Sequence, residues 1–437
     1  MDFIFSEEQK KFRQEVQDFL EGEIRQGLWE PTCDAWIQTY NPEFTKRVAQ
    51  RGWIGLTWPK EHGGQGRSYI DRLILTEEML RCGAPAACHW FADRQVGGSI
   101  VTFGTEEQKR ELLPKILKGE AYIGLGMSEP GAGSDLASLQ TRATEDGDDY
   151  IINGQKTWTS GGSFVNYFYI VARTDAQAPK HRGISEFIFD ASLPGISRIP
   201  MIDTTGTEAW NDVFFDNVRV PKSCLIGEKN RGFSQVLHQL DYERSGMERL
   251  MGNYPLFETI FQFSKETKRN GKPLSQDPLI RNRLAQLQIE FEVGRLLIYR
   301  VALVMDEGRA PNWEASMSKA YSTTFEQHLA NAAMEILGLY GQLVSGSEFC
   351  PIRGLAAHSY LGSKGYSLQA GTSEILKNIL ATRGLGLPSY LSRSNTKCRR
   401  ITMNLALSEE QEMLKGAARE FLADKCPKAV VEEIEQR

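Results

Sequence analysis

A glycine-rich loop is the first stretch of the sequence whose residue types could do chemistry. Residues 128–135 read SEPGAGSD. Glycine and proline allow a close approach of the backbone to a ligand, and the amides that such a loop leaves free can bind an anionic or carbonyl oxygen. The same composition also serves structural turns. The loop therefore indicates a binding site only together with other segments.

Two acidic side chains could act as a base or contact a substrate. Glu243 lies in the segment LDYER that ends at Arg244, and Asp93 stands directly before Arg94. A positioned carboxylate can remove a proton from a substrate. Charged side chains are mostly exposed, however, so the alternatives are a solvated helical Glu243 and a surface ion pair between Asp93 and Arg94.

Composition excludes several classes of protein. The chain has 437 residues, which at about 150 residues per domain suggests roughly three domains. The net charge of -5 and the pI near 5.9 argue against a nucleic-acid binder, which uses clustered basic residues. The sequence has no run of about 18 apolar residues, so no membrane-spanning helix is expected. Its acidic first residues are unlike a signal peptide. We therefore expect a cytoplasmic or matrix-like protein.

Cysteine and histidine patterns predict neither disulfides nor a metal site. The seven cysteines are odd in number and contain no C-x-x-C pair, which is typical of reduced, structural thiols. The six histidines form neither H-x-x-x-H nor H-E-x-x-H, so no metal ligand set is expected.

The positioning elements change type twice along the chain, which predicts an α+β fold. Residues 1–122 show helical spacing, with Thr105 and Gln108 as a capping box. The apolar positions that carry this spacing are Phe12, Val16, Phe19, Leu20, Leu73, Leu75, Met79 and Leu80.

Residues 123–226 predict a middle β-domain. Strands are expected at 164–172, 184–189 and 213–220, which are rich in β-branched and aromatic residues. Asn153 and Gly154 stand between two β-prone runs, which is a hairpin signal.

Residues 227–388 predict a C-terminal four-helix bundle. Helical spacing returns at 233–242, 279–305, 313–340 and 372–381, with chain breakers between these ranges.

A repeat follows the bundle. The segment FSEEQ at 5–9 and the pair Phe19 and Leu20 reappear as LSEEQ at 407–411 and as Phe421 and Leu422. Two capped amphipathic helices can also match by chance. We interpret 389–402 as a linker and 403–437 as the start of a second, truncated unit.

The order helical, β, helical resembles the acyl-CoA dehydrogenase family over residues 2–388. The loop 128–135 and the strand KTWTSGG at 156–162 resemble the family's flavin and thioester segments. NVRVP at 217–221, GEKNRG at 227–232, EILGLYG at 335–341 and AGTSEI at 370–375 also match family segments.

The resemblance implies FAD as the cofactor. It places Trp158 beside the isoalloxazine, although a strand tryptophan could also be plain core, and it places Ser160 near flavin N5. The family implies phosphate and adenine contacts from Thr372 and Glu374, although Glu335 and Glu374 stand where many relatives have Gln. The full set of implied cofactor contacts is Leu125, Met127, Ser128, Gly133, Ser134, Trp158, Thr159, Ser160, Glu335, Gly338, Thr372 and Glu374.

The resemblance also implies removal of an α-proton from an acyl-CoA and hydride transfer from its β-carbon to the flavin. Straight-chain members carry the base directly before Gly-Thr, where this chain has Ala370. Isovaleryl-type and some bacterial steroid-type members supply it from the position that matches Glu243, which makes Glu243 the expected base. The backbone N–H of residue 370 is retained and can polarise the thioester. The substrate contacts implied are Ser134, Tyr242, Arg244, Ala370 and Asp93, the last because ring-oxidising members use an acid in this region.

Partners and alternatives follow from the same resemblance. Electrons are expected to leave through an electron-transfer flavoprotein, and the protein is expected to be a homotetramer, a heterotetramer or a dimer. Relatives often have Arg-x-x-Phe-Gly at a contact with a neighbouring subunit's FAD, where this chain has TKRNG at 267–271, so Lys268 or Arg269 would substitute. A non-catalytic partner subunit, and a flavoprotein oxidase or desulfinase, are the alternative functions.

Overall fold

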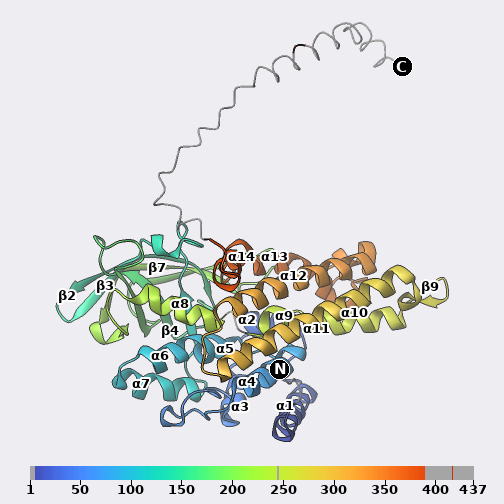
Figure 1. The fold of residues 1–437 in the computed structure, drawn as a ribbon, viewed down its shortest axis with the longest axis horizontal. Coiled ribbons are helices and arrows are strands. Elements are labelled where there is room, and N and C mark those ends of the chain that lie inside the picture. Colours follow the sequence, from blue (N-terminus) through green and yellow to red (C-terminus); the bar gives the residue numbers. More distant parts are fainter. Residues whose placement is uncertain (1–4, 244–245, 389–415, 417–437) are drawn as a thin grey trace. The chain divides into compact units, whose positions relative to one another are not determined.

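The computed structural model describes residues 5–243, 246–388 and 416. The chain divides into two compact units, Met1–Gly386 and Leu387–Arg437. The predicted linker, and the predicted second unit apart from Gly416, lie outside the described residues. Figure 1 shows the order of the elements in the first unit.

The first part of the chain is helical, as predicted. All eight apolar positions chosen from the sequence are buried. Both reciprocal bonds of the Thr105 capping box are present, with the Gln108 N–H 3.2 Å from the Thr105 hydroxyl and the Thr105 N–H 2.9 Å from the Gln108 side chain. The helices are α1 (Glu7–Arg25), α2 (Ala35–Gln38), α3 (Pro42–Gln50), α4 (Tyr69–Arg81), α5 (Ala87–Phe91), α6 (Gly97–Phe103) and α7 (Glu106–Leu117), with a 3-10 turn η1 (Lys60–His62) and a π-helical turn η2 (Ala92–Val96).

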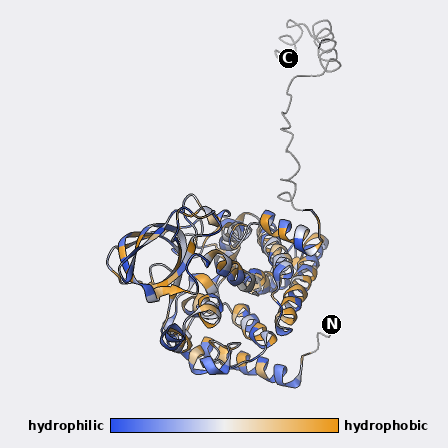
Figure 2. Ribbon diagram, turned by 60° about the vertical axis from the view of Figure 1, so that its left-hand side comes forward, coloured by the Kyte–Doolittle hydropathy of each residue, from blue (hydrophilic) through white to orange (hydrophobic). Residues whose placement is uncertain are grey.

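The middle part forms one mixed sheet whose strands curve around an apolar core (Figure 2). The strand order is β6-β7-β3-β2-β4-β5-β8, and β1 pairs with β4 in parallel. The strands are β1 (Ile123–Gly126), β2 (Arg142–Asp146), β3 (Asp149–Ser160), β4 (Tyr167–Arg173), β5 (Ile184–Asp190), β6 (Ile196–Met201), β7 (Trp210–Pro221) and β8 (Leu225–Ile226).

The hairpin predicted at Asn153 and Gly154 is wrong, because both residues lie inside β3. The register between β3 and β7 shifts there, and Gly154 has a φ of 148°. A Cβ on Gly154 would lie 2.7 Å from the Cα of Thr141, so glycine is required for close packing. The Asn153 side chain accepts a bond from the Asn217 N–H across the sheet. The turn that joins β2 to β3 instead contains Gly147, with a φ of 60°.

The C-terminal part is helical. It contains α8 (Gly232–Glu243), α9 (Glu248–Met251), α10 (Tyr254–Glu266), α11 (Pro278–Asp306), α12 (Asn312–Leu337), α13 (Leu355–Tyr366) and α14 (Ser373–Ile379), and a small hairpin of β9 (Lys268–Arg269) and β10 (Lys272–Pro273). Helix α12 ends at Leu337 rather than at the predicted Tyr340, because Gly338 has a φ of 59° and a 3-10 turn follows.

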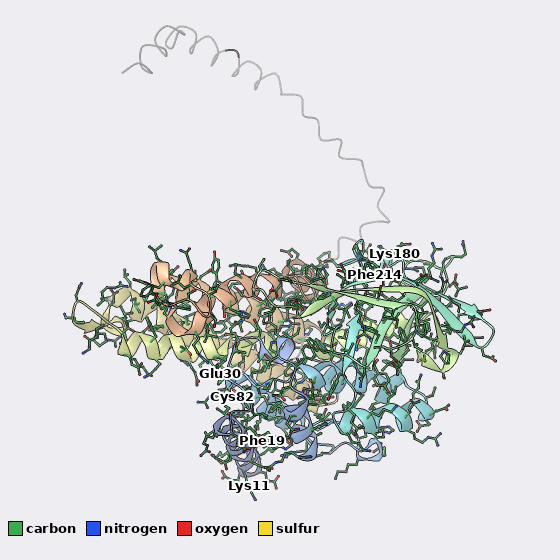
Figure 3. All side chains as sticks on the ribbon, turned by 180° about the vertical axis from the view of Figure 1, so that it is seen from behind. Lys11, Phe19, Glu30, Cys82, Lys180 and Phe214 are labelled. Atoms are coloured by element: carbon green, nitrogen blue, oxygen red, sulfur yellow. The ribbon has the colours of Figure 1, made fainter. Side chains whose placement is uncertain are left out.

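Three apolar clusters hold these parts together. The largest joins the N-terminal and C-terminal helices into one core, which includes Phe19 (Figure 3). A second fills the sheet. A third, of Ala132, Leu139, Val171, Ile184 and Val236, joins the glycine-rich loop to β4, β5 and α8. No described helix is apolar and long enough to cross a membrane.

Candidate active site

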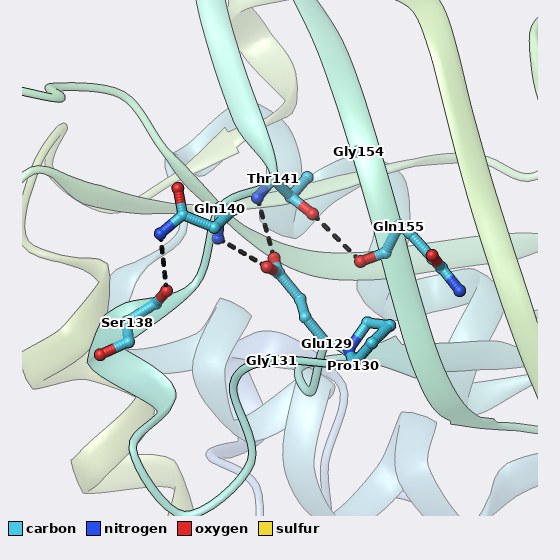
Figure 4. A pocket seen from close by; sticks show the side chains of 8 residues that line it. All are labelled: Glu129, Pro130, Gly131, Ser138, Gln140, Thr141, Gly154 and Gln155. Carbon is cyan, nitrogen blue, oxygen red and sulfur yellow. Dashed lines mark hydrogen bonds between the residues drawn. The ribbon is translucent and has the colours of Figure 1, made fainter.

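The glycine-rich loop is anchored by a buried ion pair. The Lys156 ammonium lies 2.8 Å from the Glu129 carboxylate and 3.0 Å from the Met127 carbonyl. The same carboxylate accepts bonds from the Gln140 and Thr141 backbone N–H groups at 2.5 and 2.9 Å (Figure 4). Burial lowers the pKa of Lys156 to about 8, and Glu129 opposes that shift. The fold of the loop therefore depends on a satisfied buried charge pair.

The loop and the strand before it present the predicted contacts at different depths. Leu125, Met127 and Ser128 are half-buried, whereas Gly133 and Ser134 are exposed. The Ser128 carbonyl accepts a bond from the Thr157 N–H at 2.9 Å, which ties the loop to β3. The structure therefore brings the two predicted flavin segments side by side.

A bulge in β3 turns Trp158 outward. The register between β3 and β7 shifts between Lys156 and Thr159, and Trp158 has a φ of 59°. Its side chain is 57% exposed and contacts the edge of Trp210, whereas Thr159 is fully buried. The interpretation of Trp158 as core is therefore wrong. The Thr159 hydroxyl has no hydrogen-bond partner among the described residues, and Ser160 is half-buried.

The turn before α14 holds Ala370 in the left-handed region, with a φ of 51°. Lys319 on α12 is buried and donates to the carbonyls of Tyr366 and Gly371, both at 2.8 Å. Arg249 donates to the Gln369 side chain at 3.0 Å. The residues on both sides of Ala370 are thus fixed by buried cations, which can hold a strained backbone in place.

Helix α8, which carries Glu243, packs against the same helix as α14 does. Glu243 is the last residue of α8. Helix α12 packs against α8, α9 and α14, so one helix contacts both α8 and the helix that begins after the turn at Ala370. Helix α8 also packs against η2, which carries Asp93. The side chains of Tyr242, Glu243 and Arg244 lie outside what the structure describes.

Asp93 and Arg94 are not a surface ion pair. Asp93 is 9% exposed, and its carboxylate accepts the Gly55 N–H at 2.8 Å. The Arg94 guanidinium stacks over the Trp90 ring at 3.8 Å and donates to Thr76. Burial lowers the pKa of Arg94 to about 10. The bond to Gly55 gives Asp93 a structural task, and its substrate contact stays a prediction.

The remaining predicted cofactor residues lie at the C-terminal end of α12 and at the start of α14. Glu335 is exposed and forms a bidentate ion pair with Arg283. Gly338 ends α12, Thr372 caps α14 by accepting the Ile375 N–H at 3.3 Å, and Glu374 is exposed. The described residues contain no group of three or more acidic, Cys or His side chains placed to hold a metal.

The sequence did not point to several residues of this site. Glu129 and Lys156 lie within the recognised motifs, but the motifs assign them no role, and Lys319 and Arg249 lie outside the motifs. A lysine or arginine inside an apolar helical pattern was the available signal for the last two, since buried cations are rare without partners.

Comparison with known proteins identifies the family. Models of three acyl-CoA dehydrogenase domains match the chain: the N-terminal domain at residues 6–120, the middle domain at 124–218 and the C-terminal domain at 230–385. The chain belongs to the acyl-CoA dehydrogenase family. Its α+β fold, with helical, β and helical parts in that order, is the fold of this family, as predicted.

Individual relatives of this acyl-CoA dehydrogenase include steroid-type proteins. Acyl-CoA dehydrogenase FadE26 of Mycobacterium tuberculosis is 32% identical over 400 residues, which are 89% of this chain and 99% of that protein. A solved structure titled Tcur3481-Tcur3483 steroid ACAD has a TM-score of 0.80 at 31% identity, with 89% of this chain and 100% of that chain covered. The ChsE4-ChsE5 complex of M. tuberculosis has a TM-score of 0.79 at 32% identity, with 89% and 100% covered. The chain is therefore an oxidoreductase of a flavoprotein family, and its reaction is the dehydrogenation of an acyl-CoA.

Proposed function

We propose that this acyl-CoA dehydrogenase desaturates a branched, cyclic or otherwise bulky acyl-CoA, with Glu243 as the base that removes the α-proton. The observation that carries the proposal is the turn at residues 369–373, which holds Ala370 where the family's straight-chain members have their carboxylate. Ala370 cannot ionise, and Glu243 ends a helix that packs against α12, as the helix after that turn does. The steroid-type names among the relatives favour a bulky acyl group.

The residues present fit FAD. Trp158 exposes a large aromatic face from a strained bulge, and the buried Thr159 hydroxyl beside it has no partner among the described residues. FAD supplies the hydride acceptor when bound. We propose that Leu125, Met127, Ser128, Gly133, Ser134, Trp158, Thr159, Ser160, Glu335, Gly338, Thr372 and Glu374 hold it.

The helical side of the site is suited to orient the thioester. Arg249 lies beside the turn through its bond to Gln369, and fixed positive charge next to a carbonyl stabilises the negative charge that develops on proton removal. Glu243 takes the α-proton, while Ser134, Tyr242, Arg244, Ala370 and Asp93 are the proposed substrate contacts. The carboxylate of Asp93 would act with its Gly55 bond in place.

Exposed apolar surface supports an oligomer. Ile289, Val293 and Leu296 form a stripe at helical spacing on α11, with 59%, 40% and 45% of their surface exposed. Such a stripe on a monomer is typical of an interface with another protein. The exposed Lys268 and Arg269 lie on the hairpin that projects beyond α10 (Figure 1). We propose a dimer or tetramer with like or unlike subunits, a cytoplasmic location and transfer of electrons to an electron-transfer flavoprotein.

The test is the substitution Glu243→Gln, which keeps the shape of the side chain and removes the proton acceptor. We expect flavin reduction by a panel of acyl-CoAs to fall by roughly 10²–10⁴-fold, which is typical of general-base loss. FAD content, measured by the absorbance of the purified protein, should be unchanged. Glu228→Gln is the matched control, because Glu228 is an exposed carboxylate in the loop before α8.

Three outcomes would contradict parts of this proposal. Near-normal flavin reduction by Glu243→Gln would move the base elsewhere, with Asp93 next. Folded protein that never retains FAD would favour the partner-subunit alternative, which the ChsE4-ChsE5 complex makes concrete. Direct oxygen consumption, or reduction without an enoyl-CoA product, would favour an oxidase or desulfinase.

A further inference from the structure

A buried hydrogen bond ties the first turn of α8 to the sheet. Glu186 on β5 is fully buried, and Gln235 on α8 is 5% exposed. Gln235 Nε2 donates to the Glu186 carboxylate at 2.8 Å and to the Ile226 carbonyl at 3.1 Å. Gln235 Oε1 accepts the Glu228 N–H at 3.2 Å. The amide group of Gln235 is therefore bonded through both its nitrogen and its oxygen, which fixes the orientation of the side chain.

Two packing contacts hold the same turn against the sheet. A Cβ on Gly232, the first residue of α8, would lie 2.9 Å from the backbone of Ser185, so glycine allows this close approach. Val236 packs in an apolar cluster with Val171 of β4 and Ile184 of β5. The N-terminal part of α8 is therefore attached to the sheet at three neighbouring positions.

The same sheet carries segments that are proposed to hold FAD. Strand β5 pairs with β4, β4 pairs with β1, and β3 belongs to the same sheet. Leu125 lies on β1 and Trp158 lies on β3. Glu243 is the last residue of α8 and follows Gln235 by eight residues, which is about 12 Å along the helix axis. A shift of α8 at Gln235 would therefore move Glu243 relative to the flavin segments.

A buried carboxylate at position 186 is not the most stable choice. Burial disfavours its charged form and raises the pKa of Glu186 to about 7, although the Tyr169 hydroxyl and Gln235 favour the carboxylate. Two apolar side chains would fill the same contact without that penalty. Apolar contact is non-directional, however, and would let α8 slide or rotate, whereas a hydrogen bond requires one direction. The pair is therefore suited to fix a position rather than to add stability.

We propose that Glu186 is a positioning residue for the dehydrogenation. It acts through Gln235, whose bond sets the axial position and the rotation of α8 on the sheet, and α8 in turn places Glu243 against the α-carbon of the acyl-CoA. Because Glu186 is fully buried, it has no direct contact with the substrate in this assignment. The inference rests on the proposed function, because it explains how the proposed base is held.

The experiment removes the hydrogen bond from either side in the full chain loaded with FAD. Glu186→Met and Gln235→Met keep the length of the side chain and remove the acceptor or the donor. The acyl-CoA that reduces the wild-type flavin fastest is used, and stopped-flow absorbance gives the rate of flavin reduction and the apparent Kd. We expect the rate to fall by about 10- to 100-fold in each variant with Kd unchanged, because misplacing a catalytic group slows proton removal more than it weakens binding.

A conservative variant and a double variant separate positioning from general loss of stability. Glu186→Gln retains an oxygen that can accept from Gln235, so it should restore most of the rate. The double variant Glu186→Met with Gln235→Met should be no slower than the slower single variant, because both changes remove the same bond.

Gln108→Met is the matched control. Gln108 is another buried glutamine, and it donates to the carbonyls of Ser223 and Leu225 at 2.7 and 2.8 Å. It ties α7 to the segment around β8, and α7 carries none of the proposed site residues. Its loss should therefore lower stability and leave the rate of flavin reduction unchanged.

Three results would overturn the inference: normal rates in Glu186→Met and Gln235→Met, a rate in Glu186→Gln as low as in Glu186→Met, or an equal loss of rate in Gln108→Met. If Glu186→Met does not fold, Gln235→Met and Glu186→Gln carry the same test. Hydrogen exchange of the α8 amides, followed by mass spectrometry, should rise in Gln235→Met and not in Gln108→Met. If Glu243→Gln reduces the flavin at a near-normal rate, the proposed function fails, and the exchange of α8 then tests its attachment by itself.

Discussion

The two buried carboxylates that flank the candidate site differ in how they are satisfied. On the β-domain side, Glu129 accepts bonds from Lys156 and from two backbone amides. On the helical side, the buried Asp34 carboxylate faces the His358 imidazole at 3.5 Å. The first cluster is complete within the protein, and so it serves to fix the loop. The second is a longer contact of two ionisable groups, and the Asp34 carboxylate raises the pKa of His358.

The largest expected effect is the loss of the complete cluster. Lys156→Met leaves the Glu129 carboxylate buried without its counter-ion, which should lower the free energy of unfolding by about 3–5 kcal/mol. Urea denaturation measures this change. The double variant with Glu129→Gln should recover part of the loss. Asp34→Asn removes the charge that faces His358 at 3.5 Å, and because that pair is longer the loss should be smaller, at about 1–3 kcal/mol. Equal losses at both positions would contradict the comparison.

A third buried carboxylate, Glu186 on β5, gives a pH dependence of intermediate size. Burial raises its pKa to about 7 from the ordinary 4.5, although Gln235 donates to it at 2.8 Å. Between these two values the folded protein binds more protons than the unfolded chain. Its stability should therefore fall as the pH rises from about 4.5 to about 7, by about 3 kcal/mol, and then level off.

Thermal and urea unfolding across this pH range measure the Glu186 contribution. Glu186→Gln removes the titrating group and should lose the corresponding slope, which makes it more stable than the wild type near pH 8. An unchanged slope in the variant would show that Glu186 is not buried in solution.

The smallest effect concerns the turn at Ala370. Ala370→Gly relieves a left-handed alanine, so we expect a gain of about 0.5–1 kcal/mol, measured as a raised midpoint of thermal unfolding. Ala320→Gly on α12 is the control and should lower stability by about the same amount, because glycine weakens a helix. A loss of stability in both variants would mean that Lys319 and Arg249 hold the turn without strain.

Local sequence patterns predicted the local features of the fold. The Thr105 capping box is a contact between residues three apart, and the sequence predicts it correctly. The Asn153 and Gly154 signal failed because the packing of β3 against Thr141 and β7 decides that conformation, and no local motif contains those partners. The ion pair of Glu129 with Lys156 joins a loop to a later strand, so its residues were recognised by motif but their contact was not.

The candidate site shows the same division. The family resemblance supplied the expected flavin segments and the proposal that Glu243 replaces a carboxylate at position 370, but not the buried cations that hold the turn. Asp34 and Trp36 lie in a stretch without helical or strand periodicity, and their approach to Gly252 joins two segments far apart in the sequence. Contacts between segments that are far apart in the chain could not be predicted, because no local sequence pattern contains both partners.

Because of the bulge in β3, the number of residues in that strand affects which side chains are buried more than the identity of most of them does. In a regular strand Lys156 and Trp158 would share a face, yet the structure buries Lys156 and Thr159 and exposes Trp158 between them. A deletion of one residue here would restore the even alternation and reverse the inside and outside assignment on one flank of the bulge. Insertions and deletions at 156–159 should thus be far less tolerated than substitutions, because they change the facing of every residue on one side of the bulge.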